Sequence, residues 1–271
     1  MGGLVTPKVS FITGVKNRAS DLKEMIQSLI DQDMTEWEAL IVDDHSDESI
    51  EAVVTGFHDD RLRFFQLPEG LNGVSCARNL AINHAQSDIL LTADGDDVSR
   101  PQRARVTYDA MIKNRYDAFY SNLEYFSADN KKWTVDYQPF VADLLPMFNF
   151  ITNPGTAYRK EVILEVGGFD PNFILSEDYD VWLRFLKAGA KFGYTEEILV
   201  NYRRGGGSIS IQKFAQTHEY IQKARIKNNF PPINIEKAQN LATPEIAAAI
   251  LSENGRKLWH DDRYKVSKED K

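Results

Sequence analysis

The sequence predicts an α/β fold in which helices flank a mixed, mostly parallel sheet. Short apolar runs alternate along the chain with segments whose apolar residues recur at helical spacing. The apolar runs lack the polar alternation of a half-exposed strand, as expected when helices cover both faces of a sheet. We therefore expect successive strand and helix units joined by crossover connections, a Rossmann-like arrangement.

The first part of the chain supplies four strands, each followed by a polar stretch and a helix. In the first unit, Asp21 and Glu24 predict a capping box at the start of the helix. Pro101 is typical of a helix start and continues the order. The expected strands cover residues 9–13, 39–42, 62–67 and 89–93, and the expected helices cover residues 22–30, 50–54, 74–85 and 101–114.

The pattern loosens in the second part of the chain. A strand is expected over residues 118–125 and a helix over residues 177–188, with an aromatic and loop-rich stretch between them. The tail shows helical segments interrupted at prolines. The expected organisation is a domain over residues 1–213, divided into parts 7–125 and 126–213, and a helical C-terminal extension over residues 214–271.

Composition and charge exclude several classes of protein. The formal net charge of −8 argues against a nucleic-acid partner, although a divalent cation can still join carboxylates to a nucleotide. Cys76 is the single cysteine, which excludes an intramolecular disulfide and a cysteine-based zinc site. No segment approaches the roughly 20 apolar residues of a membrane span. We expect a cytoplasmic protein that contacts the inner face of a membrane only from its periphery.

Polar clusters follow three of the expected strands, at residues 13–18, 43–47 and 94–97. Ligands bind outside the carboxyl ends of the strands in open parallel sheets. Any one of these clusters also fits a solvated turn or a helix cap. Together they indicate a binding site at one edge of the sheet.

The sequence Asp94-Gly95-Asp96-Asp97 follows a strongly apolar strand. Close carboxylates repel one another unless a cation neutralises them, and hard oxygen ligands suit Mg or Mn. The spacing of a calcium-binding loop is absent, as are the glycine-rich dinucleotide loop and the Walker motif. A metal–pyrophosphate site is the interpretation that remains.

These motifs resemble the inverting family 2 glycosyltransferases of the GT-A fold. The resemblance spans roughly residues 7–210, and the motifs keep the family's order. The matching segments are the loop 13–18, Val42-Asp43-Asp44-His45-Ser46, Cys76-Ala77-Arg78-Asn79, residues 94–97, Gly167-Gly168-Phe169-Asp170, residues 177–184 and Tyr202-Arg203.

The resemblance implies that residues 7–125 bind a nucleotide-sugar and that residues 126–213 face the acceptor. Asp44 would accept a hydrogen bond from the base, and Arg78 would lie near the base or the phosphates. Asp96 would bind the divalent cation, Mn or Mg, directly, and Asp94 would meet the ribose or the metal shell. The implied nucleotide-sugar residues are Thr13, Val15, Asn17, Arg18, Asp44, Arg78, Asp94, Gly95 and Asp96.

The resemblance also makes Asp178 the catalytic base. An acidic residue in the first turn of a helix is favoured by the helix dipole alone, so the sequence leaves both readings open. Trp182 lies at helical spacing with neighbouring apolar residues, which favours core packing over stacking on a sugar. The residues assigned to the acceptor or to a lid are Asn153, Gly155, Glu177, Trp182, Arg203 and Arg204.

The implied reaction transfers a hexosyl or N-acetylhexosaminyl group from a nucleoside-diphosphate-sugar, with uridine favoured, to a hydroxyl of a glycan or glycolipid. Surface polysaccharide biosynthesis is the expected setting. The sequence departs from the family where some relatives carry a histidine that completes the metal shell, because Arg204 and Gly205–Gly207 stand there. We hypothesise that Arg203 or Arg204 contacts the pyrophosphate when this glycine loop closes.

Two alternatives stay open. A sugar nucleotidylyltransferase shares the sheet, cation and nucleotide, but its basic glycine-rich loop is poorly matched by residues 13–17. A non-catalytic nucleotide-sugar binding module would not need both Asp96 and Asp178. The extension after residue 213 could contact a membrane, pair two subunits as a homodimer or cover the acceptor groove, and its sequence does not choose among them.

Overall fold

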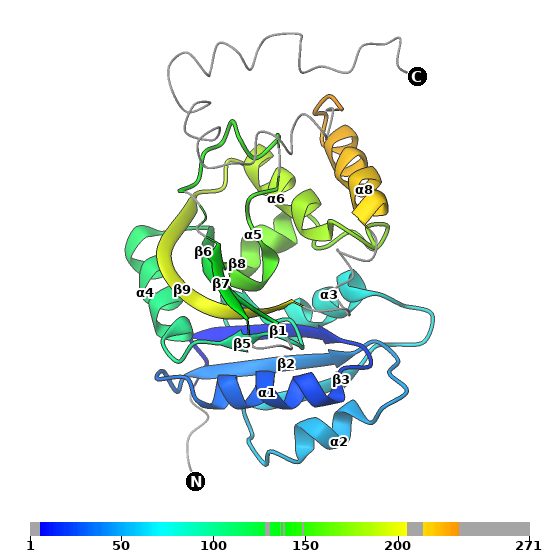
Figure 1. Cartoon of the computed structure of the whole chain (residues 1–271), viewed down its shortest axis with the longest axis vertical. Coiled ribbons are helices and arrows are strands. Elements are labelled where there is room, and N and C mark those ends of the chain that lie inside the picture. The colour runs from blue at the N-terminus through cyan, green and yellow to red at the C-terminus, as the bar shows by residue number, and fades with distance from the viewer. Residues whose placement is uncertain are drawn as a thin grey trace.

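The computed structural model describes residues 6–127, 131–135, 137, 139–147, 149–204 and 214–232. In the first part of the chain, every expected strand and helix is present, with bounds shifted by no more than a few residues (Figure 1). The elements are β1 (Val9–Val15), α1 (Ala19–Ile30), β2 (Trp37–Asp43), α2 (Ile50–Thr55), β3 (Leu62–Gln66), α3 (Val74–His84), β4 (Ile89–Thr92), β5 (Val98–Ser99) and α4 (Arg103–Asn114).

The second part contains the expected strand and helix and several elements that the sequence pattern did not predict. The longest of these, β9, carries exposed Glu196 and Glu197, and its pairing with β6 shifts register near Asn122. These irregularities hide the strand from a search for periodic apolar residues. The elements are β6 (Ala118–Ser127), β7 (Lys132–Val135), η1 (Asn153–Gly155), β8 (Thr156–Arg159), α5 (Lys160–Glu165), α6 (Glu177–Lys187), β9 (Phe192–Arg204) and α8 (Phe214–Lys227).

All strands of the described residues belong to one nine-stranded sheet with the order β3-β2-β1-β4-β8-β6-β9-β5, and β7 pairs with β6. Strands β1 to β4 are parallel to one another, as are β6 and β9. Because β8 runs antiparallel to both β4 and β6, these two strands point the same way. The mixed, mostly parallel sheet that the sequence predicts is confirmed.

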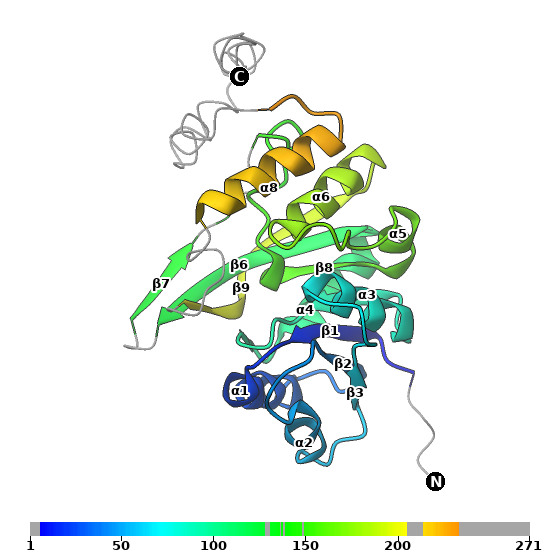
Figure 2. The same cartoon turned by 90° about the vertical axis from the view of Figure 1, so that its right-hand side faces the viewer.

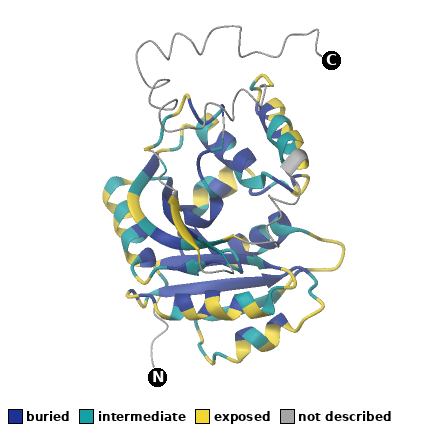
Figure 3. Cartoon of the chain, viewed as in Figure 1, coloured by how far each residue is buried: buried dark blue, intermediate teal, exposed yellow. Residues whose placement is uncertain are grey.

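Helices cover both faces of the sheet, and the side chains of β1 show why its sequence lacks polar alternation. Phe11 packs into a core with residues of α1, α2 and α4. Its neighbour Ile12 points to the opposite face and packs with residues of α3, α5 and α6. Neither side chain has exposed surface, and the buried strands lie between the helical layers in Figure 3. Both faces of the strand are therefore apolar.

The strand order reverses between β1 and β4. After β1 the chain adds β2 and β3 on one side, and it then returns to place β4 on the other side of β1. Loops that leave the carboxyl ends of β1 and β4 consequently diverge and leave a crevice between them. The loop residues 16–18 and 94–97, which the sequence analysis selects, lie at these two ends.

The start of α1 differs from the expected capping box. The helix begins at Ala19, and its N-cap residue Arg18 makes no side-chain capping hydrogen bond. Asp21 accepts a hydrogen bond from the Arg18 guanidinium at 3.2 Å, and Glu24 accepts one from Arg203 at 2.6 Å. Both acids therefore hold arginines of the crevice instead of capping the helix.

The described part of the C-terminal extension packs against the domain, where α8 lies beside α6 (Figure 2). Asp180 of α6 is fully buried and pairs with Arg184 at 2.7 Å and with Lys227 at 2.9 Å. Asn228 donates a further hydrogen bond to the same carboxylate at 3.0 Å. The residues beyond 232, and with them most of the expected extension, lie outside the described part. No helix of the described part is long and apolar enough to cross a membrane.

Trp182 belongs to the core of the domain. Its side chain has no exposed surface and packs edge-on against Tyr158 and Phe185. The core-packing interpretation is confirmed, and the assignment of Trp182 to the acceptor side does not hold in this structure. An acceptor cannot reach a ring that is enclosed on all sides.

Trp182→Ala should lower the free energy of unfolding by about 3–5 kcal/mol, because the truncation leaves a large cavity. Trp133 on β7 is the matched control, since it is 39% exposed and stacks on Tyr125. Its replacement by alanine should cost about 1 kcal/mol. Urea unfolding of both variants measures the difference. If Trp182→Ala lowered the free energy of unfolding by no more than the control does, the assignment of Trp182 to the core would be contradicted.

Candidate functional site

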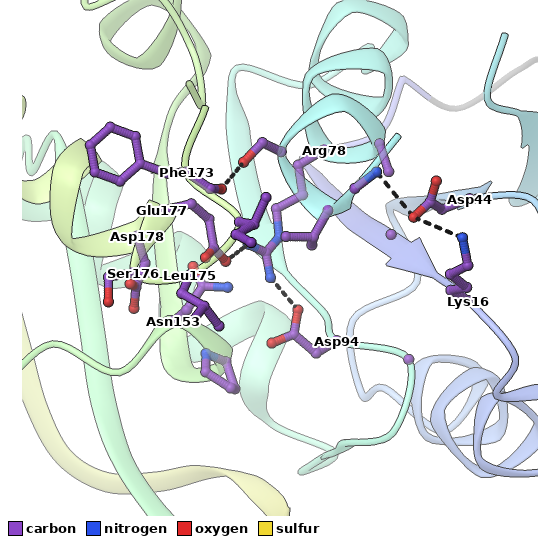
Figure 4. A pocket seen from close by; sticks show the side chains of 18 of the residues that line it. Lys16, Asp44, Arg78, Asp94, Asn153, Phe173, Leu175, Ser176, Glu177 and Asp178 are labelled. Atoms are coloured by element: carbon purple, nitrogen blue, oxygen red, sulfur yellow. Dashed lines mark hydrogen bonds and ion pairs between the residues drawn. The ribbon is translucent and has the colours of Figure 1, made fainter. Parts of the chain in front are cut away.

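A cleft with a cavity volume of about 660 Å³ opens beyond the carboxyl ends of β1 and β4. Its walls come from the loops after these strands, the start of α3, the segment around η1, the start of α6 and the end of β9 (Figure 4). Both parts of the domain therefore contribute. The predicted site residues that line the cleft are Val15, Arg18, Asp44, Arg78, Asp94, Gly95, Asp96, Asn153, Glu177, Asp178 and Arg203.

Arg78 joins the two sides of the cleft. The residue is 3% exposed, and its guanidinium donates to Asp94 at 2.6 Å and to Glu177 at 2.7 Å. Burial alone would lower the pKa of Arg78, but the two carboxylates raise it above its ordinary value. Arg78 is therefore a permanent cation that ties the loop after β4 to the first turn of α6.

Asp44 lies at the end of β2 and faces the cleft. One carboxylate oxygen, Oδ2, accepts a hydrogen bond from the backbone N–H of Gly73 at 3.1 Å, and Lys16 lies 3.8 Å from the same oxygen. The other oxygen, Oδ1, is buried and has no partner among the described residues. Gly73 has a φ of 88°, a conformation that glycine adopts without strain. Asp44 thus presents an unsatisfied hydrogen-bond acceptor within the cleft.

The loop after β4 gathers carboxylates at the centre of the cleft. Burial, together with the charge of Asp94, raises the pKa of Asp96, even though Arg18 lies 3.7 Å away. Gly95 makes this loop fit, because a Cβ there would lie 3.2 Å from the Val15 side chain. Acids crowded in this way ionise more readily when a cation neutralises them.

The donor atoms of this loop suit a hard divalent cation. Asp94 and Asp96 offer carboxylate oxygens, the ligands that Mn and Mg prefer. In the described part of the chain, no three His, Cys, Asp or Glu side chains come together as a complete metal site. The two carboxylates therefore fit a cation that takes its remaining ligands from water and a bound phosphate.

Asp178 lies in the first turn of α6 and faces the cleft. Its carboxylate accepts hydrogen bonds from the backbone N–H of Tyr179 at 2.7 Å and from the Asn149 amide at 3.2 Å. Burial, followed by the charge of Glu177, raises the pKa of Asp178 to about 7. Ser176, just before the helix, has a φ of 55°, and backbone strain of this kind often marks functional sites. A carboxyl with this pKa suits proton abstraction near neutral pH.

Arg203 lines the cleft and bonds to the acidic loop after β4 and to α1. Its backbone N–H donates to Asp97 at 2.8 Å, and its guanidinium donates to Glu24 at 2.6 Å and to the backbone carbonyl of Asp96 at 2.9 Å. These bonds fasten β9 to the acidic loop. Residues 205–213, which carry the expected glycine lid, lie outside the described residues.

Four further predicted site residues do not line the cleft, so the structure does not place them where they would contact a ligand. Thr13 is fully buried within β1. Asn17 turns outward and bonds to Asp47 at 3.1 Å, which ties together the loops after β1 and β2. Gly155 packs beneath the cleft, where a Cβ would come within 2.9 Å of a β6 side chain. Arg204 is exposed, and its guanidinium lies 5.3 Å from the ring centre of Tyr125.

Sequence reasoning missed several residues of the site. Asn149 bonds the candidate base, yet it comes from a segment without regular spacing. Thr217 and Ile221 of α8 also line the cleft, so the extension contributes to one wall. For Gly73, the sequence did offer a signal, since a glycine stands directly before the expected helix α3. In the structure, its backbone N–H donates to Asp44.

The chain is similar in sequence to one known glycosyltransferase and in structure to others. The chain is 26% identical over 215 residues to the UDP-Glc:alpha-D-GlcNAc-diphosphoundecaprenol beta-1,3-glucosyltransferase WfgD of Escherichia coli, covering 77% of this chain and 81% of the relative. The structure of S. aureus TarS 1-349 in complex with UDP-GlcNAc matches with a TM-score of 0.66 at 16% identity, covering 93% of this chain and 78% of that chain.

A second solved structure has the same architecture. The mannosyltransferase PcManGT from Pyrobaculum calidifontis, in complex with GDP-Man and Mn2+, matches with a TM-score of 0.62 at 17% identity and covers 93% of this chain and 78% of that chain. These two likenesses confirm the GT-A fold. The profile described as Glycosyl transferase family 2 matches residues 10–172, more than half of the chain and most of the cleft. The chain therefore belongs to glycosyl transferase family 2.

Proposed function

We propose that this glycosyltransferase moves a sugar from a UDP-sugar to an acceptor hydroxyl with inversion, and that Asp178 is the base. One observation carries the proposal. Asp44, Asp96 and Asp178, which are far apart in the sequence, line a single cleft. The cleft is thus equipped at one end for a nucleoside, at its centre for a diphosphate and at the other end for a proton acceptor.

The nucleoside end is the part of the cleft around Asp44. The unpartnered Oδ1 atom can accept a hydrogen bond from the N–H of a uracil ring. Lys16, which lies 3.8 Å from Asp44, and Arg18, which lies 3.7 Å from Asp96, also line the cleft and supply positive charge toward the phosphates. A uridine nucleotide is further supported by the names of WfgD, a UDP-Glc enzyme, and of the TarS complex with UDP-GlcNAc.

Asp96 and Asp94 would hold a divalent cation, Mn or Mg, against the diphosphate. When bound, such a cation stabilises the negative charge that develops on the leaving nucleoside diphosphate. The raised pKa of Asp96 and the oxygen-only donor set support this assignment. The presence of Mn2+ in the PcManGT complex supports it from a distant structure.

Asp178 would take the proton of the acceptor hydroxyl. As the acceptor oxygen bonds to the anomeric carbon from one side, the bond from that carbon to the diphosphate breaks on the other. A single displacement of this kind inverts the anomeric centre. The pKa of about 7 makes Asp178 a stronger base than an ordinary aspartate, and Asn149 orients its carboxylate.

The acceptor side of the cleft has an apolar rim. Ile174 lines the cleft and is 57% exposed, and Ile221 of α8 lies on the same cleft. This rim and the lipid-linked acceptor in the name of WfgD support a glycolipid acceptor in surface polysaccharide assembly. Peripheral contact with a membrane would bring such an acceptor to the cleft.

Asp178→Asn should lower turnover by about 10²–10⁴-fold, because it removes the base and keeps the shape of the side chain. The affinity for UDP should stay unchanged. Turnover is measured as UDP release in the presence of acceptor, and affinity by calorimetry. Asp109→Asn, at an exposed position of α4, is the matched control. Full turnover by Asp178→Asn would refute the role, and release of pyrophosphate by the wild-type enzyme would identify a nucleotidylyltransferase.

The rate should rise with pH through about 7, because only the ionised carboxylate of Asp178 can accept a proton. Below this pH, log kcat/KM should increase with a slope near one. Glu177→Gln should move the midpoint to lower pH, since the charge of Glu177 contributes to raising the pKa of Asp178. A pH–rate profile of both enzymes measures the shift. A profile that is flat between pH 5 and 8 would argue against a titrating base at this position.

Chelation should abolish turnover, and added Mn or Mg should restore it. Asp96→Asn should need at least tenfold more cation for half-maximal rate, because it removes a charged ligand. Cation titrations of the wild-type and variant enzymes give the two values. Turnover that survives exhaustive chelation would remove the metal from the proposal.

A further inference from the structure

Asn153 is a polar residue of the cleft whose side chain makes no hydrogen bond to the described part of the chain. It is 6% exposed, it lines the cleft, and neither its amide oxygen nor its amide nitrogen has a hydrogen-bond partner among the described residues. Leaving both ends of a buried amide unsatisfied is costly. Such a group is expected where a ligand completes the hydrogen bonds.

The backbone around Asn153 is fixed in place. The carbonyl of Asn153 accepts a hydrogen bond from Thr156 Oγ1 at 2.6 Å, and the carbonyl of Pro154 accepts one from the buried Arg103 at 2.7 Å. Gly155 is closely packed, because a Cβ there would lie 2.9 Å from the Leu123 side chain and 3.3 Å from the backbone carbonyl of Ser121. The Asn153 amide is therefore held ready in the cleft and does not need to be ordered by a ligand.

The segment around η1, which carries Asn153, is connected both to the end of β4 and to Asp178. Arg103 donates to the carbonyl of Thr92, two residues before Asp94, as well as to the carbonyl of Pro154. The same segment supplies Asn149, which bonds to Asp178. Figure 4 draws Asn153 between Asp178 and Asp94. Asn153 thus belongs to a segment that contacts β4 on one side and, through Asn149, the candidate base on the other.

We infer that the Asn153 amide binds a hydroxyl group of the sugar being transferred and contributes to the choice of donor sugar. This inference rests on the proposed function. In an inverting displacement the base and the leaving group lie on opposite sides of the anomeric carbon, so the sugar ring must occupy the space between them. A hydroxyl both donates and accepts, which matches an amide with one free donor and one free acceptor. The residue would then belong to the donor side, and the acceptor role expected from the sequence would be replaced.

The test compares the affinities of UDP and of UDP-sugars for the same protein. Calorimetric titrations with UDP, UDP-glucose, UDP-galactose and UDP-N-acetylglucosamine, in the presence of Mn, are made on the wild-type enzyme, Asn153→Ala and Asn153→Asp. Both variants should bind UDP as the wild type does and should bind the preferred UDP-sugar about tenfold more weakly. The difference between the affinities for the epimers UDP-glucose and UDP-galactose should also become smaller. Because the Asn153 side chain makes no hydrogen bond within the described residues, both variants should fold, and thermal melting checks this.

Asn72→Ala is the control, because Asn72 lines the cleft next to Gly73, at the nucleoside end. It should change the affinities for UDP and for the UDP-sugar by the same factor. The inference is wrong if Asn153→Ala leaves the ratio of the affinities for UDP and for the UDP-sugar at its wild-type value, whether both affinities stay the same or both fall by the same factor. It is also wrong if the substitution alters only the KM of the acceptor. If the wild-type enzyme binds neither UDP nor any UDP-sugar, the proposed function fails, and the inference falls with it.

Discussion

The double ion pair of Arg78 is the interaction on which the geometry of the cleft depends. Asp94 comes from the loop after β4 and Glu177 from the first turn of α6, and a single buried guanidinium holds both. Removing one partner of a buried ion pair typically costs about 3–5 kcal/mol, because the remaining charge is left without compensation. The same contact fixes the separation between the loop that carries Asp94 and Asp96 and the helix that carries Asp178. The site is therefore assembled by an electrostatic contact between two parts of the domain.

The reversal of strand order supplies the space that this contact spans. Helices on both faces leave little room for a ligand along the sheet, so the crevice at the ends of β1 and β4 is the open region. The antiparallel strand β8 then brings η1 beside the end of β4, and this places Asn153 within the cleft. Topology thus explains why residues from both parts of the domain meet at one place.

Much of the first part of the fold could be predicted from the sequence, because buried parallel strands and amphipathic helices have distinct periods. The acidic residues Asp44, Asp94 and Asp96 could be predicted as well, since they directly follow such strands. The loops of the second part could not. Asn149 lies in a segment without periodicity, and β9 is interrupted by exposed acids. Asn17 follows a strand just as the acids do, yet it turns outward, which no spacing rule reveals.

The order of charges across the cleft links binding to catalysis. Asp94, Arg78, Glu177 and Asp178 follow one another from the end proposed for the diphosphate to the proposed base. Glu177 forms an ion pair with Arg78 at 2.7 Å, and its negative charge helps to raise the pKa of Asp178. The positive charge of Arg78 acts on Asp178 in the opposite direction and lowers its pKa. The residue that holds the cleft together therefore also limits how far burial and Glu177 raise the pKa of the group that would accept the proton.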